Sequence, residues 1–433
     1  MSRIAIVGAG SLVFTRTLVS DLLQQEATAD CEVHLVDIDK GRLKDACRAV
    51  EHLAARAGRQ VHVVASTSCA EGARGCDYVI VTVQVGGREA TRLDFEIPER
   101  FGVRQTIADT HGIGGISRAM RTLPAVLEIA KTVADVAPDA WLLNYTNPMA
   151  MVVMGLAQAG LGSKSVGLCH GTENTASTIA RYLGLSEPSR LCWTAAGINH
   201  MTWFLKLLVD GKDVYPALRE FAERVEILGH EDSVRLELLR RFGYYVSESS
   251  VHNAEYYPWF LRDGGETEKY GVRVREYLYR LDDLKQEFET DRAGGAENAD
   301  RAPLELQTNE YAPRVIAALE ANSTIGFMGN IVNREGVIAN LPANACVEVP
   351  CFVHGAQLVS GSVGPLPEQC AALNGAQVNV QLLTVAGVLE GCLDKIYQAA
   401  FLDPLLSAQL KLDDIKSLVD EMVAAHGNPC GLH

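Results

Sequence analysis

The stretch Arg3-Ile-Ala-Ile-Val-Gly-Ala-Gly-Ser11 decides the fold class of this chain. Its apolar first half is typical of a buried strand and its two glycines of a tight turn, and apolar residues at helical spacing follow. Glycines between a strand and a helix let the backbone approach a pyrophosphate, which the amides at the helix N-terminus stabilise. We therefore predict that Gly8, Gly10 and Ser11 bind a dinucleotide, although Val13 replaces the third glycine of the usual motif.

A second predicted strand, Glu32–Val36, ends at Asp37. An acid in this place is the expected partner of the adenosine ribose hydroxyls and disfavours a 2′-phosphate, so the sequence predicts NAD rather than NADP. Gln84 follows another predicted strand, at 77–83, and is assigned to the same cofactor. The alternative is a glycine-rich turn in an α/β fold that binds no dinucleotide.

Strands and helices alternate through the first half of the chain, with further strands predicted at 61–64 and 140–143 and a helix at 43–57. This alternation is typical of a doubly wound α/β sheet. We predict an N-terminal Rossmann-type domain over 1–195 and a C-terminal α+β domain over 196–433. The second domain is expected to bind substrate and form oligomers, as in the architecture of lactate and malate dehydrogenases.

The second half of the chain is less regular. Dense mixed charge predicts surface helices over 218–241, and the charged segment 262–303 is expected to be exposed and partly mobile. Helices are predicted at 309–322 and through 378–425. The segment 243–260 concentrates aromatic, acidic and histidine side chains, so it is either a sugar site or an ordinary aromatic part of the core.

The composition excludes several classes of partner. The formal charge of −15, from 54 acidic and 39 basic residues, argues against nucleic acid and anionic membranes and favours a small neutral substrate. The eleven cysteines show no CxxC spacing, which favours reduced thiols over a disulfide framework. A strand that begins within a few residues of the N-terminus leaves no room for a signal peptide, and the apolar stretch 149–161 is too short to span a membrane. We predict a soluble cytoplasmic protein.

Two short apolar runs end in potential metal ligands. Val166-Gly-Leu-Cys-His-Gly171 delivers Cys169 to a strand end, and Gly197-Ile-Asn-His200 delivers His200. Because functional side chains gather in the loops at strand ends, these two residues could share one metal ion. A buried cysteine and a core histidine without a metal are the plainer alternative.

A polar, glycine-rich loop at 105–115 contains Asp109 and opens a helix that carries Arg118. Loops of this composition usually line a site, and the alternative is an extended turn with Arg118 on a solvated helix face. Asn147 is held extended by Pro148, and its amide can bind a hydroxyl or the nicotinamide.

Seven motifs occur together and in order along the chain. Through them the sequence resembles the family 4 glycoside hydrolases, and within that family the melibiase-type α-galactosidases. The melibiase-like members carry a serine where this chain has Gly171, and a Cys-His-Gly signature also resembles members that act on α-glucosides or α-uronides. The resemblance therefore leaves the sugar open among galactose, glucose and a uronic acid. The motifs are VGAGS (7–11), QTIADTHGIGGISRAMRT (105–122), LNYTNPMAM (143–151), GLCHG (167–171), GINHM (197–201), ESSVHNAEYYPWF (248–260) and NLPANACVEVPC (340–351).

The resemblance implies hydrolysis by transient oxidation, an exception to the usual scheme of two carboxylates. It implies that NAD accepts a hydride from sugar carbon 3, which acidifies the hydrogen on carbon 2, and that Mn²⁺ binds the oxygens on both carbons. Removal of the carbon 2 proton then expels the glycosidic oxygen, water adds, and the retained NADH returns its hydride. Similar proteins also imply a homodimer or homotetramer.

The resemblance also implies roles for individual residues. It assigns Cys169 and His200 to the metal, and Tyr256 to the base, because a nearby cation lowers the pKa of a phenol. Tyr257 and Glu255 are the competing candidates for the base. Assistance to the leaving group or binding of the substrate is assigned to His170, a supporting catalytic role to Asp109, and substrate contacts to Asn147, Arg118 and Glu255.

Two other functions fit parts of the sequence. A 2-hydroxy acid dehydrogenase of the lactate or malate type shares the NAD features, but it needs a substrate-clamping arginine and an Asp–His pair and no cysteine ligand. A non-enzymatic NAD-dependent sensor would retain the fold and leave Cys169, His200 and Tyr256 without a chemical role.

Overall fold

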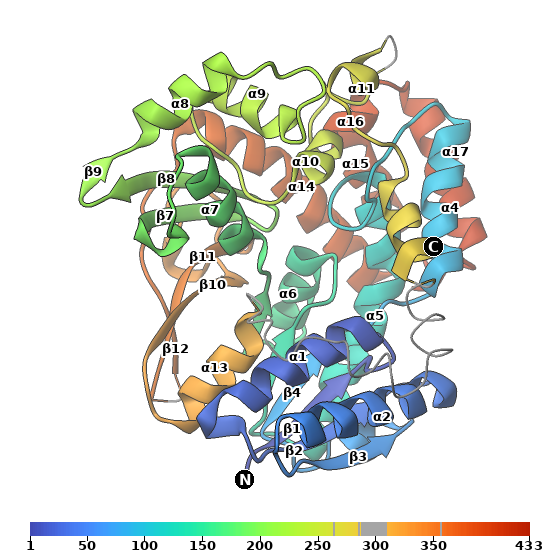
Figure 1. Cartoon of the computed structure of the whole chain (residues 1–433). Coiled ribbons are helices and arrows are strands. Elements are labelled where there is room, and N and C mark those ends of the chain that lie inside the picture. The colour runs from blue at the N-terminus through green and yellow to red at the C-terminus, as the bar shows by residue number, and fades with distance from the viewer. Residues whose placement is uncertain (263–264, 285, 287–309, 356) are drawn as a thin grey trace.

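Figure 1 shows the computed structural model of the chain, which describes residues 1–262, 265–284, 286, 310–355 and 357–433. Most of the second half of the charged segment 262–303, which was expected to be exposed and partly mobile, lies outside the described residues.

The first part of the sheet is parallel and has the order β3-β2-β1-β4-β5-β6. This is the strand order of a dinucleotide-binding fold, and it confirms the predicted doubly wound architecture. Buried apolar side chains fill these strands on both faces, except in the edge strand β3, because helices cover both faces of the sheet. The strands are β1 (Arg3–Val7), β2 (Glu32–Val36), β3 (His62–Ser66), β4 (Tyr78–Val81), β5 (Trp141–Asn144) and β6 (Ser165–Leu168).

The same sheet continues beyond β6 as an antiparallel part, in the order β10-β11-β7-β8-β9, with β12 paired to β11. The junction is an antiparallel pairing of β6 with β10, in which Leu168 faces Gly329. The predicted domain boundary at 195/196 falls inside β7, and the division into two domains remains a prediction. The strands are β7 (Leu191–Ile198), β8 (Met201–Val209), β9 (Lys212–Asp213), β10 (Ile325–Val332), β11 (Cys346–His354) and β12 (Gln357–Ser360).

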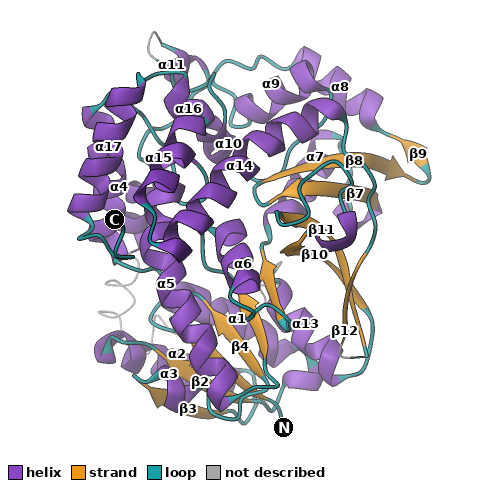
Figure 2. Ribbon diagram, turned by 180° about the vertical axis from the view of Figure 1, so that it is seen from behind, coloured by secondary structure: helices purple, strands orange, loops and turns teal. Residues whose placement is uncertain are grey.

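Helices of the first 160 residues cover the parallel sheet, and the helices from residue 368 onward form a further layer packed on them (Figure 2). In that layer α14 packs against α5, α6 and α15, and α17 packs against α4. The helices are α1 (Leu12–Gln24), α2 (Lys40–Arg56), α3 (Cys69–Gly72), α4 (Gly87–Arg100), α5 (Gly112–Val136), α6 (Met149–Gln158), α7 (Gly171–Tyr182), α8 (Tyr215–Arg224), α9 (Ser233–Phe242), α10 (Ser250–Tyr256), α11 (Glu266–Lys269), α13 (Tyr311–Glu320), α14 (Glu368–Glu390), α15 (Leu393–Leu402), α16 (Pro404–Ser407) and α17 (Leu412–Ala425).

The prediction of surface helices over 218–241 is wrong for α9. Val234, Leu236 and Leu239 of α9 are buried, and so is Arg235, which donates to the buried Asp232 at 2.5 Å. The dense charge of this segment predicts a solvated face, but two of its charged side chains are buried. Their burial is possible because Arg235 and Asp232 form an ion pair that compensates each charge.

Helix α14 is the one helix of the described chain that is long and apolar enough to cross a membrane, and half of its most apolar window is buried inside the structure. It also carries four buried polar residues, Asn374, Gln377, Gln381 and Thr384, at a spacing of three or four. Residues at this spacing lie on one side of a helix. This row of polar residues, hereafter the α14 polar row, faces the interior of the protein, as expected of a core helix.

Candidate active site

The glycine turn after β1 packs closely against the neighbouring strands. A Cβ atom at Gly8 would lie 2.8 Å from the Thr82 carbonyl, and one at Gly10 would lie 2.6 Å from Asp37 Oδ2, so neither position admits a side chain. The Gly10 N–H donates to Asp37 Oδ2 at 2.7 Å, which fixes the acid beside the turn. Within the described chain the Ser11 side chain makes no capping hydrogen bond, so the first amides of α1 are open to an anion. The turn therefore fits the pyrophosphate and ribose of a dinucleotide.

Gln84 lies in the loop that follows β4, where its Nε2 donates to Thr91 Oγ1 of α4 at 3.2 Å. The same loop is held from α5, because Arg121 Nε donates to the Val85 carbonyl at 3.1 Å and the Arg121 guanidinium pairs with the buried Asp94. The loop is thus fixed at the end of the parallel strands, where a cofactor of this fold lies.

Asp109, Asn147 and Arg118, which were predicted from separate motifs, come together between α4 and α5. Asn147 Nδ2 donates to Asp109 Oδ2 at 3.0 Å. Burial acts to raise the pKa of Asp109, but the charges of Arg118 and two nearby histidines outweigh it and lower this pKa. Arg118 is buried, and its Nη1 has no hydrogen-bond partner among the described residues. An unpaired buried N–H beside a carboxylate is suited to a substrate oxygen.

The imidazole of His200 and the phenol of Tyr256 meet beside this group. His200 Nδ1 lies 3.1 Å from the Tyr256 hydroxyl and 3.1 Å from Thr110 Oγ1. Burial raises the pKa of Tyr256 well above its ordinary value, and the negative charge of Asp109 adds to the effect. A neighbouring cation would reverse this shift. A bound metal would therefore make Tyr256 a candidate base.

Three residues of this region have left-handed backbone conformations that favour glycine: Ala108 (φ 56°), His200 (φ 63°) and Glu248 (φ 72°). Such conformations cost about 1 to 3 kcal/mol each and gather at functional sites. The strain thus marks the same region as the polar contacts do.

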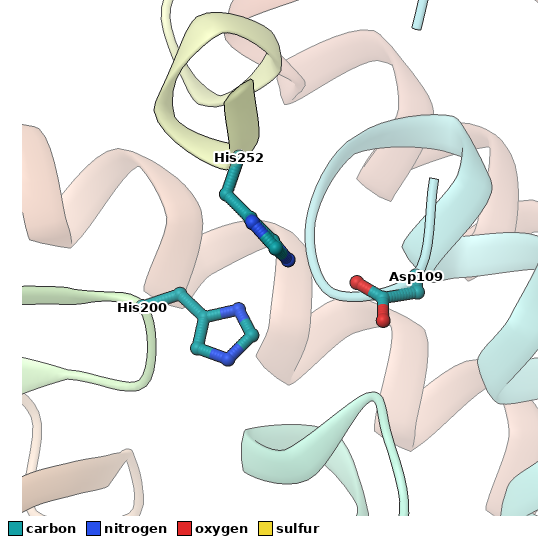
Figure 3. A group of neighbouring side chains, drawn as sticks. All are labelled: Asp109, His200 and His252. Carbon is teal, nitrogen blue, oxygen red and sulfur yellow. The ribbon is translucent and has the colours of Figure 1, made fainter. Parts of the chain in front are cut away.

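Figure 3 shows Asp109, His200 and His252 pointing toward one another from the 105–111 loop, the β7–β8 turn and α10. All three are buried, and one ligand atom of each lies within 4.8 Å of the others. A carboxylate with two imidazoles suits a divalent metal such as Mn²⁺. These three residues, hereafter the buried cluster, fit a metal.

Cys169 stands directly after β6 and, among the described residues, is not a member of the buried cluster. A Cβ at Gly171 would lie 3.5 Å from both Cys169 Sγ and Glu248 Oε2, so the thiol and this acid flank the same glycine. Burial raises the pKa of the Cys169 thiol, and the charges of Glu348 and Glu248 raise it further. A thiol beside two acids loses its proton only when a cation is present. Its surroundings suit a metal ligand, and the Cys169–His200 pair remains a prediction.

His170 is partly exposed, with 44% of its side chain accessible, and its Nδ1 lies 2.7 Å from Glu310 Oε1. This hydrogen bond is the main cause of the raised pKa of His170. Glu310 thus orients the ring and favours its protonated form, which can donate a proton from the other nitrogen.

Glu255 bonds to three backbone N–H groups. Its Oε2 accepts the N–H groups of Thr106 and Ile107 at 2.7 and 3.0 Å, and its Oε1 accepts that of Ala108 at 2.9 Å. Both carboxylate oxygens thus hold the loop that carries Asp109, and the prediction that Glu255 binds substrate stays a prediction. Glu255 is a positioning residue for that loop.

Sequence reasoning missed His252 and Glu310. His252 precedes Tyr256 by four residues on α10, so the two side chains share one helix face, and recognition of that short helix would have revealed the pair. Glu310 is 140 residues away from His170, and no local signal connects them.

A parallel sheet of the dinucleotide-binding type, together with the buried cluster and the tyrosine that contacts it, is typical of an enzyme. The chain belongs to family 4 of the glycosyl hydrolases: the family model matches residues 3–185, and the model of its C-terminal domain matches residues 195–406. This membership confirms the predicted glycosidase over the dehydrogenase and sensor alternatives.

Individual relatives agree with this membership. The chain is 39% identical to an α-galactosidase of Bacillus subtilis, over 99% of each chain. It is 35% identical to an α-galactosidase of Rhizobium meliloti, over 98% of this chain and 88% of that one. Its fold is also that of a 6-phospho-α-glucosidase from gut microorganisms, solved in complex with NAD and Mn²⁺, with a TM-score of 0.84 at 20% identity and full coverage of both chains.

Proposed function

We propose that this protein hydrolyses α-galactosides with the help of NAD and Mn²⁺. The α-galactosidases of Bacillus subtilis and Rhizobium meliloti support the sugar, and the NAD and Mn²⁺ complex of the structurally similar 6-phospho-α-glucosidase supports the cofactors. The observation that carries the proposal is the 3.1 Å contact between Tyr256 and His200 at the edge of the buried cluster. It places a candidate base beside a candidate metal ligand.

The glycine turn and Asp37 would hold NAD, and His200 with Asp109, His252 or Cys169 would hold the metal. When bound, NAD supplies a hydride acceptor and the metal supplies a Lewis acid for the sugar oxygens. The fit rests on positions that admit no Cβ in the turn and on donor atoms suited to Mn²⁺ in the cluster.

The chain's own residues would handle the protons. The Tyr256 hydroxyl oxygen is the proposed acceptor of the proton on sugar carbon 2. His200 holds that oxygen in place, and Thr110 in turn bonds to His200. His170, oriented by Glu310, is the proposed donor to the departing glycosidic oxygen. Tyr256 is buried and His170 is partly exposed, so the base would act inside the site and the acid at its rim.

Three residues are proposed to bind sugar hydroxyls: Asn147, Asp109 and Arg118. The amide of Asn147 and the carboxylate of Asp109 are already joined, and a hydroxyl can bridge such a pair as donor and acceptor. Arg118 contributes its unpaired Nη1.

Arg118 also supports a second substrate class, α-uronides such as α-galacturonides or α-glucuronides. A buried guanidinium N–H without a partner binds a carboxylate more strongly than a hydroxyl, because the hydrogen bond is charge-assisted. The same mechanism on α-glucosides is the remaining alternative. We further propose a cytoplasmic homodimer or homotetramer; the eleven cysteines, all of which lie in the described part of the chain, are free thiols.

The test is hydrolysis of nitrophenyl α-galactoside, α-glucoside, α-glucuronide and α-galacturonide with NAD, Mn²⁺ and a reductant, each omitted in turn. Cleavage of the galactoside that stops without NAD or without Mn²⁺ is the expected result. Preferred cleavage of a uronide would replace the proposed sugar, and undiminished cleavage after chelation would remove the metal from the proposal.

A further inference from the structure

The α14 polar row contacts two backbone segments and one histidine side chain of the candidate active site. Asn374 Nδ2 donates to the Met201 carbonyl at 2.9 Å, and its Oδ1 accepts from Trp203 Nε1 at 3.1 Å, so it holds the start of β8 next to His200. One turn further, Gln377 Nε2 donates to the Tyr256 carbonyl at 3.0 Å, which fixes the end of α10. A single buried helix thus contacts the segments that carry the candidate metal ligand and the candidate base.

The third residue of the α14 polar row, Gln381, contacts the imidazole of His111. Gln381 Nε2 lies 3.3 Å from His111 Nδ1, and His111 Nε2 lies 3.2 Å from the Asn199 carbonyl. Because the carbonyl requires a donor, Nε2 carries the hydrogen, and Nδ1 then accepts from the Gln381 amide. The Asn199 carbonyl therefore selects this neutral tautomer of His111, and the Gln381 amide complements it by donating to Nδ1.

His111 joins the two functional side chains. It holds the carbonyl of the residue before His200, in a turn where His200 has φ of 63°. On its other side its ring packs edge-on against Tyr256, with ring centroids 4.4 Å apart and planes at 88°. The three rings are thus fixed relative to one another by one buried imidazole, which is 1% exposed.

We propose that His111 and Gln381 are positioning residues that set the geometry between Tyr256 and the metal ligand His200. This inference rests on the proposed function, because it takes Tyr256 as the base and His200 as a ligand. Groups that orient metal ligands and catalytic side chains typically contribute about 10-fold to 100-fold to metal affinity or activity. An amide 270 positions away from its histidine would then act on the reaction without touching the substrate.

The α14 polar row contains its own control. Thr384 is buried like Gln381 and lies three residues further along the helix, but its Oγ1 donates at 2.8 Å to the Val380 carbonyl of the same helix. Thr384→Val removes a buried hydrogen bond of α14 without disturbing His111. Gln381→Leu removes the amide that faces His111, and His111→Phe keeps an aromatic ring against Tyr256 but loses both hydrogen bonds.

The experiment measures Mn²⁺ binding to the full-length protein by the electron paramagnetic resonance of free Mn²⁺, together with kcat, KM and the deuterium isotope effect at sugar carbon 2. For Gln381→Leu and His111→Phe we expect the Kd for Mn²⁺ to rise and kcat to fall, each by about 10-fold or more, with KM within about 3-fold. The isotope effect should increase, because proton removal becomes slower. Thr384→Val should match the wild type in all four quantities.

The outcomes separate the inference from the proposed function. If the wild type binds no Mn²⁺ and shows no isotope effect, the proposed function fails. If the wild type binds Mn²⁺ and both variants bind and turn over as the wild type does, His111 and Gln381 have no positioning role. If His111→Phe does not fold, as seen by its melting curve, Gln381→Leu decides the question, because it alters only the amide end of the side chain. Equal losses in Thr384→Val would likewise overturn the inference, since they would show a general loss of stability.

Discussion

The glycine turn and the buried cluster are built in different ways. In the glycine turn, Gly10 and Asp37 belong to consecutive strand–turn units and are joined directly by one hydrogen bond. In the buried cluster, three side chains arrive from a loop, a strand turn and a helix that are far apart in sequence. A site of the first kind follows from local spacing, whereas one of the second kind depends on tertiary contacts. The two should therefore respond separately to substitution.

The largest expected effect is a loss of kcat on removal of the candidate base, Tyr256. Tyr256→Phe should lower kcat by about 1,000-fold, because a positioned general base typically contributes 10²-fold to 10⁴-fold. The variant should bind NAD with unchanged affinity, because the Tyr256 hydroxyl contacts His200 and not the glycine turn. Turnover at saturating substrate, with NAD affinity from fluorescence titration, measures both.

Tyr257→Phe is the matched control for this prediction. Tyr257 is equally buried and stacks on Trp259, and its hydroxyl has no partner among the described residues. Loss of that hydroxyl should leave kcat unchanged. If Tyr257→Phe is the inactive variant and Tyr256→Phe turns over normally, the base has been assigned to the wrong tyrosine.

The next largest expected effect is a loss of Mn²⁺ affinity on removal of a candidate ligand from the buried cluster. His252→Ala should weaken Mn²⁺ binding by about 10-fold to 100-fold, because it removes one of the three ligand groups that converge within 4.8 Å. Binding of NAD should not change. His62→Ala, at an exposed histidine of the parallel sheet, provides the control. Wild-type Mn²⁺ affinity in His252→Ala would restrict the metal to Cys169 and His200, as the family resemblance implies.

A smaller effect is expected at the glycine turn. Asp37→Ala should weaken NAD binding by about 10-fold, the size of one hydrogen bond to a charged group, and should narrow the preference for NAD over NADP. Mn²⁺ affinity should stay the same. Asp37→Asn keeps an acceptor for the Gly10 N–H and should lose less affinity. A parallel loss of Mn²⁺ binding in Asp37→Ala would show that the two regions are coupled, which contradicts the comparison.

The sequence alone predicts the parallel sheet and its glycine turn well, because each strand, turn and acid lies within a short window. It also predicts that Asp109, Asn147 and His200 belong to a site, since each follows a strand or opens a helix in a polar loop. The structure brings them together, since Asn147 donates to Asp109 and Thr110 bonds to both Asp109 and His200, and their role in a site stays a prediction.

What could not be predicted depends on contacts between distant segments. Glu255 reads as a site acid, yet three backbone N–H groups bind it, and only the folded loop reveals them. Gln381 reads as a polar residue on an apolar helix, and its partner His111 is 270 positions away. In the aromatic segment 243–260, Tyr256 faces the site while Tyr257 packs in the core, a difference set by the end of α10.

The smallest expected effect lies at the rim, where Glu310 meets His170. The hydrogen bond from His170 to Glu310 is the main cause of the raised pKa of the imidazole, so the carboxylate keeps His170 protonated to higher pH. Glu310→Gln retains an acceptor for the ring but removes the charge, so the pKa of His170 should fall. A general acid acts only while it is protonated, so activity should then be lost at a lower pH than in the wild type. The alkaline limb of the kcat/KM profile should move to lower pH, and activity below that limb should be kept.

Glu310→Ala, which also frees the ring, should lower kcat at every pH. A profile unchanged in Glu310→Gln would mean that His170 binds substrate rather than donating a proton, which would leave the departing oxygen to another acid of the site.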